Sequence, residues 1–270
     1  MDKLYGLQIE SSTACNARCN FCPVGLKKLT RPKGHMSDEL FHKLVKEAME
    51  IGVEETLIFK DGEPLLFNRF FEWLDYLSER DLKTAIFTNA SLLTREKADR
   101  LAQYKNIKFI YCSVHGGDKA TYESMMGLNY ETTVANVQYL ISVAHNFPVT
   151  VYMLSTAQTK ASEAGFNQLW GSHAFISGAY YNWGGAVENP DPSTEGPQEP
   201  CGRILTQLQV LHDGRVALCC QDGDGSVILG DANTEHIQTI WERAQPLRDR
   251  HKAYDFAMSL CENCNLNRYK

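Results

Sequence analysis

Three cysteines near the start of the sequence have the spacing of an iron–sulfur ligand set. Cys15, Cys19 and Cys22 form a C-x3-C-x2-C motif, and three thiolates in one short loop can ligate three irons of a cubane [4Fe–4S] cluster. The fourth iron then has no protein ligand nearby in the sequence, so it is open to a small molecule. Structural zinc is the alternative, but zinc prefers four ligands in a closed site, and only His35 and His42 lie close by. The motif therefore favours an Fe–S cluster with an open iron.

A second group of cysteines lies near the other end of the sequence. Cys261 and Cys264 are separated by two residues, a spacing that suits either zinc or an Fe–S cluster. Cys201 and one member of the adjacent pair Cys219 and Cys220 can complete four ligands. Strand alternation places Cys220 on an apolar face that we expect to be core. Cys219 is therefore the favoured ligand of the pair.

The residues before position 184 predict six strands that alternate with helices. Short apolar runs indicate the strands, and apolar residues at helical spacing after the capping residues Ser37, Asn68 and Thr94 indicate helices. The predicted strands are 7–10, 56–59, 84–87, 107–114, 149–154 and 175–181, and the predicted helices are 37–51, 68–80, 94–104, 130–145 and 163–170. A full barrel needs eight such repeats in about 250 residues. The sequence therefore predicts an α/β fold with a partial, TIM-like (β/α)6 barrel.

Polar and reactive residues follow the ends of these predicted strands. The first cysteines, the DGEP segment 61–64, the TNA segment 88–90 and the SVHGG segment 113–117 all stand at such positions. In barrels of this kind the active site lies at the carboxyl ends of the strands, where the loops gather. The agreement of these positions supports both the fold and the site.

A stretch rich in glycine, proline and acidic residues divides the sequence. Residues 184–200 read as a linker, which predicts a barrel domain over 1–183 and a small domain over 201–270. In the small domain, Asp213-Gly214 between two alternating runs predicts a β-hairpin, and residues 237–250 predict a helix.

The motif layout of residues 1 to about 183 resembles the radical S-adenosylmethionine (SAM) superfamily. Gly62-Glu63-Pro64 resembles the family's glycine-glycine-glutamate-proline motif, with Asp61 in place of its first glycine. The resemblance implies that SAM chelates the open iron. It implies SAM contacts by Phe21, Gly62, Glu63, Pro64, Thr88, Asn89 and Ser113. It further implies a flavodoxin- or ferredoxin-type reductant and a 5′-deoxyadenosyl radical that abstracts hydrogen from the substrate, chemistry that belongs to the cofactor.

The second cysteine group resembles the SPASM region of that superfamily in its short "twitch" form. The resemblance implies one auxiliary cluster, and thus two [4Fe–4S] clusters in all, with Cys201, Cys219, Cys261 and Cys264 as the auxiliary ligands. In length and cysteine layout the chain resembles enzymes of the 2-deoxy-scyllo-inosamine dehydrogenase type, which implies two-electron oxidation of a small-molecule alcohol or amino-sugar. A peptide-modifying enzyme, a redox-neutral epimerase or isomerase, and a non-catalytic metal-binding module are the alternatives.

Other residues are weaker candidates for roles in the chemistry. His115, Tyr180 and Arg203 are candidate catalytic residues because each stands next to a predicted strand end or a cysteine ligand. The basic loop Lys27–Lys33 is expected to be solvated, and Cys112, inside a strand, is expected to be buried core.

Composition narrows the function classes. The formal net charge is −6 and the sequence has no dense basic block, which disfavours a nucleic-acid partner. No apolar run approaches the roughly 18 residues of a membrane span, and the N-terminal residues lack a signal-peptide pattern. The sequence therefore predicts a cytoplasmic protein without structural disulfides.

Overall fold

The computed structural model describes residues 2–190 and 196–268, and its chain forms two compact units. Unit 1 comprises Met1–Ala14, Lys27–Gly62 and Tyr181–Lys270, and unit 2 comprises Cys15–Leu26 and Glu63–Tyr180. Residues 191–195 of the predicted linker lie outside the described residues. The predicted domain boundaries stay a prediction, but each compact unit is assembled from segments far apart in the sequence.

Unit 1 is built on a five-stranded sheet with the order β2-β1-β7-β8-β9. β1 (Gly6–Ile9) is buried along its whole length and pairs in parallel with β2 (Glu55–Leu57) on one side and β7 (Gln207–Val210) on the other. β8 (Arg215–Ala217) and β9 (Ile228–Asp231) continue the sheet in antiparallel fashion. The predicted hairpin therefore extends the sheet that β1 begins.

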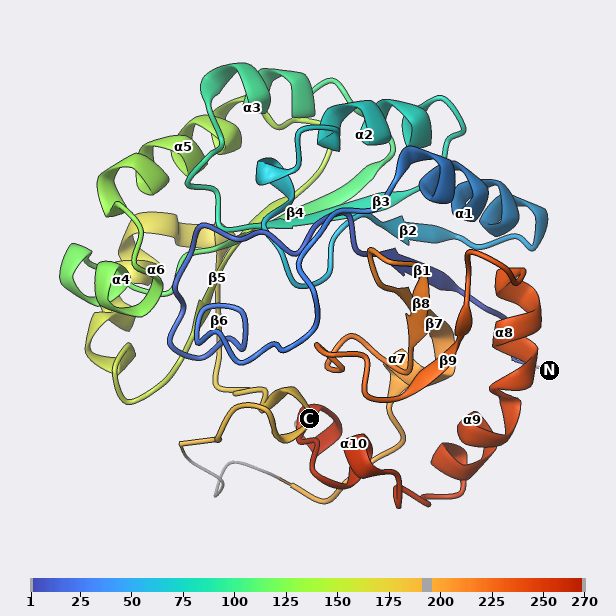
Figure 1. Ribbon diagram of the computed structural model, residues 1–270. Coiled ribbons are helices and arrows are strands. Elements are labelled where there is room, and N and C mark those ends of the chain that lie inside the picture. The colour runs from blue at the N-terminus through green and yellow to red at the C-terminus, as the bar shows by residue number, and fades with distance from the viewer. Residues whose placement is uncertain (1, 191–195, 269–270) are drawn as a thin grey trace. The chain divides into compact units, whose positions relative to one another are not determined.

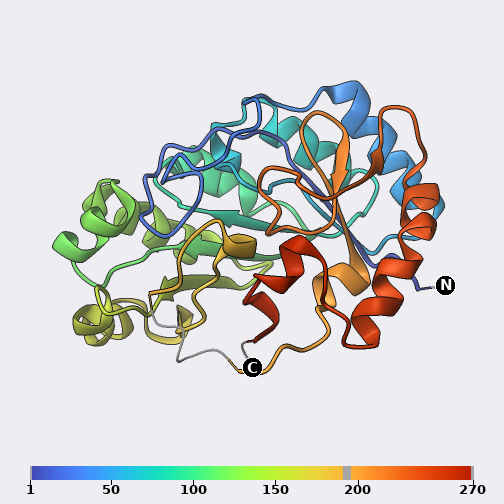
Figure 2. The same ribbon diagram turned by 60° about the horizontal axis from the view of Figure 1, so that its bottom comes forward.

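The helices of unit 1 are α1 (Asp38–Glu50), α7 (Gly202–Thr206), α8 (Ile237–Arg243), α9 (Gln245–Lys252) and α10 (Ser259–Glu262). Ser37 caps α1 as predicted, because its hydroxyl accepts a hydrogen bond from Leu40 N. Figure 2 shows α9 following directly on α8, and α8 packs against β9. The single predicted helix over 237–250 is thus two helices, since Ala244 ends α8 and precedes α9.

Unit 2 holds a parallel sheet with the order β3-β4-β5-β6. Its strands are β3 (Thr84–Thr88), β4 (Ile107–Ser113), β5 (Val149–Leu154) and β6 (Ala174–Ser177), and its helices are α2 (Phe70–Ser78), α3 (Arg95–Leu101), α4 (Lys119–Met126), α5 (Tyr130–Val143) and α6 (Glu163–Trp170). In Figure 1 the helices of this unit lie along one side of its strands. The parallel α/β architecture predicted from the apolar runs is confirmed.

Several local predictions differ from the structure. Asn68 was expected to cap the second helix, but α2 begins after Arg69, which makes no side-chain capping bond. The sixth strand ends at Ser177 rather than at position 181. α4 was not predicted, because only Tyr122, Met125 and Met126 of its residues are buried and its apolar stripe is short. None of the helices in residues 2–190 and 196–268 is long and apolar enough to cross a membrane.

Candidate active site and metal centres

The loop with the first three cysteines is fixed by backbone hydrogen bonds within unit 2. Arg18 N donates to Met126 O at 2.8 Å, so the loop is bound to the end of α4. Cys22 N donates to Cys19 O at 3.3 Å. A Cβ atom on Gly25 would lie 2.4 Å from Cys19 O, so only glycine allows this fold of the loop. The loop conformation that carries the thiols is therefore determined by the chain itself.

The three thiols of this loop are half-buried and electrostatically coupled. Burial raises the pKa of Cys19, and the negative charges of Cys22 and Cys15 raise that pKa further. Burial also raises the pKa of Cys15. Three thiolates in one loop repel one another, and a bound metal relieves this repulsion because it replaces their protons. This donor set fits a cluster with three cysteine ligands. Among the described residues, no three His, Cys, Asp or Glu side chains lie close enough together to bind a single metal ion.

Glu63 connects the end of β3 to this loop through buried hydrogen bonds. Its carboxylate accepts from Thr88 Oγ1 at 2.6 Å, from Asn89 N at 2.7 Å and from Leu65 N at 3.1 Å. Asn89 in turn donates from Nδ2 to Asn16 Oδ1 at 2.9 Å, and its side chain hydrogen-bonds the Cys15 thiol. Burial raises the pKa of Glu63. The predicted residues Glu63, Thr88 and Asn89 thus form one hydrogen-bonded group with the cysteine loop.

Gly62 has a steric reason to be glycine. A Cβ atom there would lie 2.2 Å from Ser12 O and 2.8 Å from Ala14 O, both backbone atoms of unit 1. Pro64 begins a short 3-10 helix (Pro64–Leu66), whose first turn Glu63 caps. The Gly-Glu-Pro sequence therefore combines a close backbone approach with a fixed carboxylate.

His115 is buried beside the aromatic residue of the cysteine loop. Its ring meets Phe21 edge-on at 4.6 Å between centroids, and Tyr152 at 5.2 Å. Nδ1 accepts a hydrogen bond from Leu154 N at 2.9 Å, and burial lowers the pKa of His115 to about 3. The imidazole is therefore neutral with its proton on Nε2. Its accepting nitrogen is thus already occupied by a backbone N–H, and the role of His115 as a candidate catalytic residue stays a prediction. Ser113 ends β4 half-buried, opposite Tyr152 of β5.

Asp61, the departure from the family motif, lies in a buried ion cluster of unit 1. Arg31 donates to both carboxylate oxygens of Glu10, with Nη1 to Oε2 at 2.7 Å, and to Asp61 Oδ2 at 3.0 Å. Lys60 Nζ donates to the same Asp61 oxygen at 2.5 Å. Nδ1 of His212 lies 3.1 Å from Glu10 Oε2. We refer to these five side chains as the buried ion cluster.

The buried ion cluster corrects the prediction of a solvated basic loop. Lys27, Lys28 and Lys33 are exposed as expected, but Arg31 is only 8% exposed. Sequence reasoning missed this because a lone arginine in a basic loop gives no sign of its partners. The available signal was Asp61, a charged residue where the family has a glycine.

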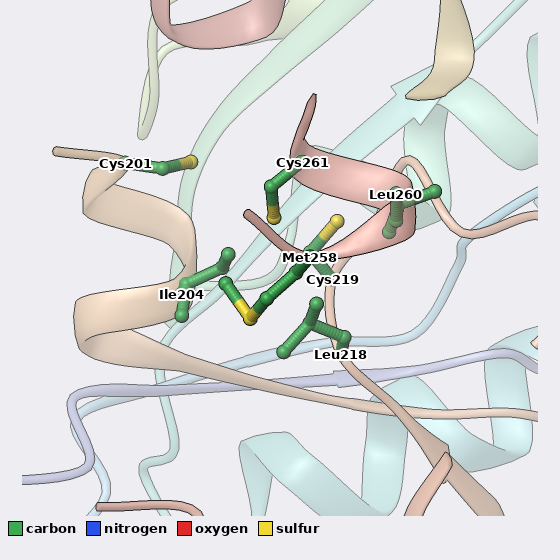
Figure 3. Packing of buried hydrophobic residues seen from close by; sticks show 7 residues of the cluster. All are labelled: Cys201, Ile204, Leu218, Cys219, Met258, Leu260 and Cys261. Atoms are coloured by element: carbon green, nitrogen blue, oxygen red, sulfur yellow. The ribbon is translucent and has the colours of Figure 1, made fainter. Parts of the chain in front are cut away.

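Four of the later cysteines line one cavity of unit 1. The cavity is lined by Cys201, Ile204, Cys219, His251, Leu260, Cys261, Cys264 and Leu266. Figure 3 shows Cys201, Cys219 and Cys261 among the apolar side chains of Ile204, Leu218, Met258 and Leu260. Burial raises the pKa of all four lining thiols, that of Cys261 to about 12. Four thiols in an apolar, buried pocket fit a cluster with four cysteine ligands.

The structure distinguishes Cys219 from Cys220, but not through the strand alternation used in the prediction. Cys219 lines the cavity and Cys220 does not. β8 ends at Ala217, so strand alternation does not extend to either cysteine, and both are buried. Cys112 is fully buried in β4, as predicted.

The remaining two candidates both stay protonated. Tyr180 is buried, and this burial raises the pKa of its phenol. Arg203 is exposed on α7, and its guanidinium stays protonated. Each can donate a hydrogen bond, but neither is prepared to accept a proton.

Comparisons with known proteins agree with this geometry. The radical SAM superfamily model matches residues 9–160, and the SPASM iron–sulfur cluster-binding domain matches residues 201–265. The S-adenosyl-L-methionine-dependent 2-deoxy-scyllo-inosamine dehydrogenase of Niallia circulans is 23% identical over 98% of this chain and 94% of its own length.

Solved structures show the same fold. The crystal structure of BtrN in complex with AdoMet and 2-DOIA has a TM-score of 0.69 at 20% identity, and the similarity covers 98% of this chain and 94% of BtrN. Streptococcus suis SuiB bound to its precursor peptide SuiA has a TM-score of 0.75 at 17% identity, covering 99% of this chain and 71% of SuiB. The fold is thus a radical SAM partial barrel with a C-terminal SPASM region. Because the superfamily model matches more than half of its length, this chain is a radical SAM enzyme, with SAM and Fe–S clusters as its cofactors.

Proposed function

We propose that this enzyme is a dehydrogenase that removes two electrons from an alcohol carbon of a small polar substrate. The observation that carries the proposal is the cavity with four cysteines, because four thiolate ligands leave no iron free to bind substrate. Such a cluster is suited to accept an electron. When bound, SAM and its cluster would supply the radical that abstracts a hydrogen atom from the substrate, and the auxiliary cluster would accept the one electron that remains on the substrate.

The chain's own residues hold and shield these groups. We assign Cys15, Cys19 and Cys22 to the SAM cluster, and Cys201, Cys219, Cys261 and Cys264 to the auxiliary cluster. The proposed SAM contacts are Phe21, Gly62, Glu63, Pro64, Thr88, Asn89 and Ser113. Among these, Glu63 is the best oriented to contact SAM, because three hydrogen bonds hold its carboxylate in one orientation. A flavodoxin- or ferredoxin-type protein is the proposed reductant.

Buried amides on the sheet of unit 1 support a polar substrate. Gln8 of β1 and Gln209 of β7 are neighbours in the parallel register, so their side chains share one face. Both residues are buried, and Gln8 Oε1, Gln209 Oε1 and Gln209 Nε2 have no hydrogen-bond partner among residues 2–190 and 196–268. An unpartnered buried amide costs about 1–3 kcal/mol for each group. A hydroxyl-bearing ligand or ordered water can supply the missing hydrogen bonds.

Peptide modification is the second candidate function. The likeness to SuiB bound to its precursor peptide supports it. The likeness to the dehydrogenase of Niallia circulans extends over nearly the whole length of both proteins, and for this reason we place small-molecule oxidation first.

Product stoichiometry tests the proposal. With 2-deoxy-scyllo-inosamine as the first substrate tried, we expect one 5′-deoxyadenosine per oxidised product. Cys261→Ala should cleave SAM but form no product, because the surplus electron loses its acceptor. Cys112→Ala, a matched loss of a buried thiol outside both sites, should form product. Normal product formation by the Cys261 variant, or SAM regenerated at each turnover, would refute the dehydrogenase and favour a redox-neutral isomerase.

A further inference from the structure

One histidine connects two of the four cysteines in the cavity. His251 lies on α9 and is 1% exposed. Its Nδ1 is 3.3 Å from Cys201 N, and its Nε2 is 3.4 Å from Cys261 Sγ. The ring of Phe256 packs against the imidazole at 4.9 Å with an interplanar angle of 66°. The imidazole is therefore held between a backbone amide and a thiol.

The partner of Nδ1 determines which nitrogen carries the proton. A backbone N–H can only donate, so Nδ1 must accept, and the neutral ring has its hydrogen on Nε2. Nε2–H then points to the sulfur of Cys261. The direction of this hydrogen bond follows from the geometry, because the opposite tautomer would place two N–H groups against each other at Cys201.

We propose that His251 donates a hydrogen bond to the Cys261 thiolate and thereby raises the reduction potential of the auxiliary cluster. This rests on the proposed function, in which Cys261 is a ligand of that cluster. Reduction adds one electron, and much of its charge resides on the sulfurs. The positive end of an N–H dipole at a ligating sulfur therefore stabilises the reduced form more than the oxidised form. His251 thus acts through a ligand of the cluster that accepts the electron, as a positioning residue, and does not itself touch the substrate.

The same histidine has a second consequence for the ligand loop. By accepting from Cys201 N, it fixes the backbone from which the Cys201 thiol projects, directly before α7. One side chain thus orients one proposed ligand and tunes another. Direct ligation of metal by His251 is the competing possibility, since the imidazole lines the same cavity.

The test is an EPR-monitored redox titration of the anaerobically reconstituted full chain. SAM perturbs the signal of the cluster that it binds, so the signal unchanged by SAM belongs to the auxiliary cluster. His251→Leu, which removes the donor, should shift the auxiliary potential to a more negative value. His251→Gln retains an N–H donor and should restore part of the shift. His145→Leu, an exposed histidine of unit 2, is the matched control and should leave the potential unchanged.

Iron content and pulsed EPR separate the possible outcomes. We expect about eight irons in the wild type and in both variants. Eight irons with an unshifted potential in His251→Leu would overturn the inference but leave the auxiliary cluster intact. About four irons in the wild type would instead overturn the proposed cluster.

A measurement on the wild type avoids dependence on the folding of the variants. In protein labelled with 15N-histidine, the reduced auxiliary cluster should show a weak nitrogen coupling through the hydrogen bond. A strong coupling would mean that His251 is a ligand, and the absence of coupling would mean that it makes no contact. Either result would refute the proposed hydrogen bond.

Discussion

Replacing Arg31 by methionine is expected to destabilise the protein severely. The variant keeps most of the side-chain volume but leaves the carboxylates of Glu10 and Asp61 in a buried site without their shared cation. Removal of one partner from a buried ion pair costs about 3–5 kcal/mol. Lys60 still contacts Asp61, so most of the lost free energy of unfolding is expected to come from Glu10.

The pKa of Glu10 provides an independent magnitude. Burial raises this pKa, but hydrogen bonds from His212 and Arg31 outweigh burial and lower it from 4.5 to about 2. A folded-state pKa below the unfolded value stabilises the protein above pH 4.5, and this stabilisation is lost as the pH falls toward 2. The difference corresponds to about 3 kcal/mol, which His212, Arg31 and Lys60 supply together against the effect of burial.

The same reasoning predicts how the defect depends on pH. Without Arg31, the pKa of Glu10 should rise, because burial, the largest single influence on it, is then opposed only by His212 and Lys60, so the folded variant takes up a proton at a higher pH than the folded wild type. The variant's deficit should therefore be largest at pH 7.5 and should shrink toward pH 5.

Urea unfolding, followed by tryptophan fluorescence and far-UV circular dichroism at both pH values, measures the deficit. Lys33→Met removes an exposed positive charge from the same loop and should change the free energy of unfolding by less than about 0.5 kcal/mol. The double variant Glu10→Gln/Arg31→Met should be more stable than the sum of the single effects predicts. A deficit below about 1 kcal/mol, or one that does not change with pH, would refute the electrostatic account.

The other predictions concern the cysteine sites. Gly25→Ala should lower the iron bound by the first cluster, because the added Cβ meets the Cys19 backbone at 2.4 Å, whereas Gly178→Ala, which meets no atom within 4 Å, should not; equal iron contents would contradict the steric argument. Cys19→Ala should abolish reductive formation of 5′-deoxyadenosine, and persistent cleavage would show that another site binds SAM. Cys219→Ala should lose about four irons, while Cys220→Ala should retain them, since only Cys219 lines the cavity; the reverse pattern would exchange their roles.

Local patterns in the sequence predicted those parts of the fold that depend on local interactions. Ser37 has the residue type of a helix cap, and its hydroxyl caps α1 because Leu40 N lies three residues away. The apolar runs that became β1, β2, β3 and β5 are mostly buried, as expected. Thr88 and Asn89 stand at the end of β3, and both hydrogen-bond the carboxylate of the motif residue Glu63. These relations extend over short spacings or over adjacent repeats.

The missed features all depend on partners distant in the sequence. Arg31 is buried because Glu10 and Asp61 come from the ends of two different strands. His251 reaches its position because α9 packs near the start of α7, with Cys201 fifty residues earlier. A sequence pattern gives the residue types but not which distant residues come into contact. Neither the ion pair nor the bridging imidazole could therefore be predicted.

The pairing of β1 with β7 has a consequence for synthesis. β1 leaves the ribosome roughly 200 residues before β7, the strand with which it pairs. At about 5–20 residues per second, β1 waits some 10–40 s with one edge unpaired. An apolar strand with an open edge is prone to pair with the wrong chain. The nascent protein therefore depends on chaperone cover or on rapid completion, and slow translation over residues 160–210 should favour aggregation.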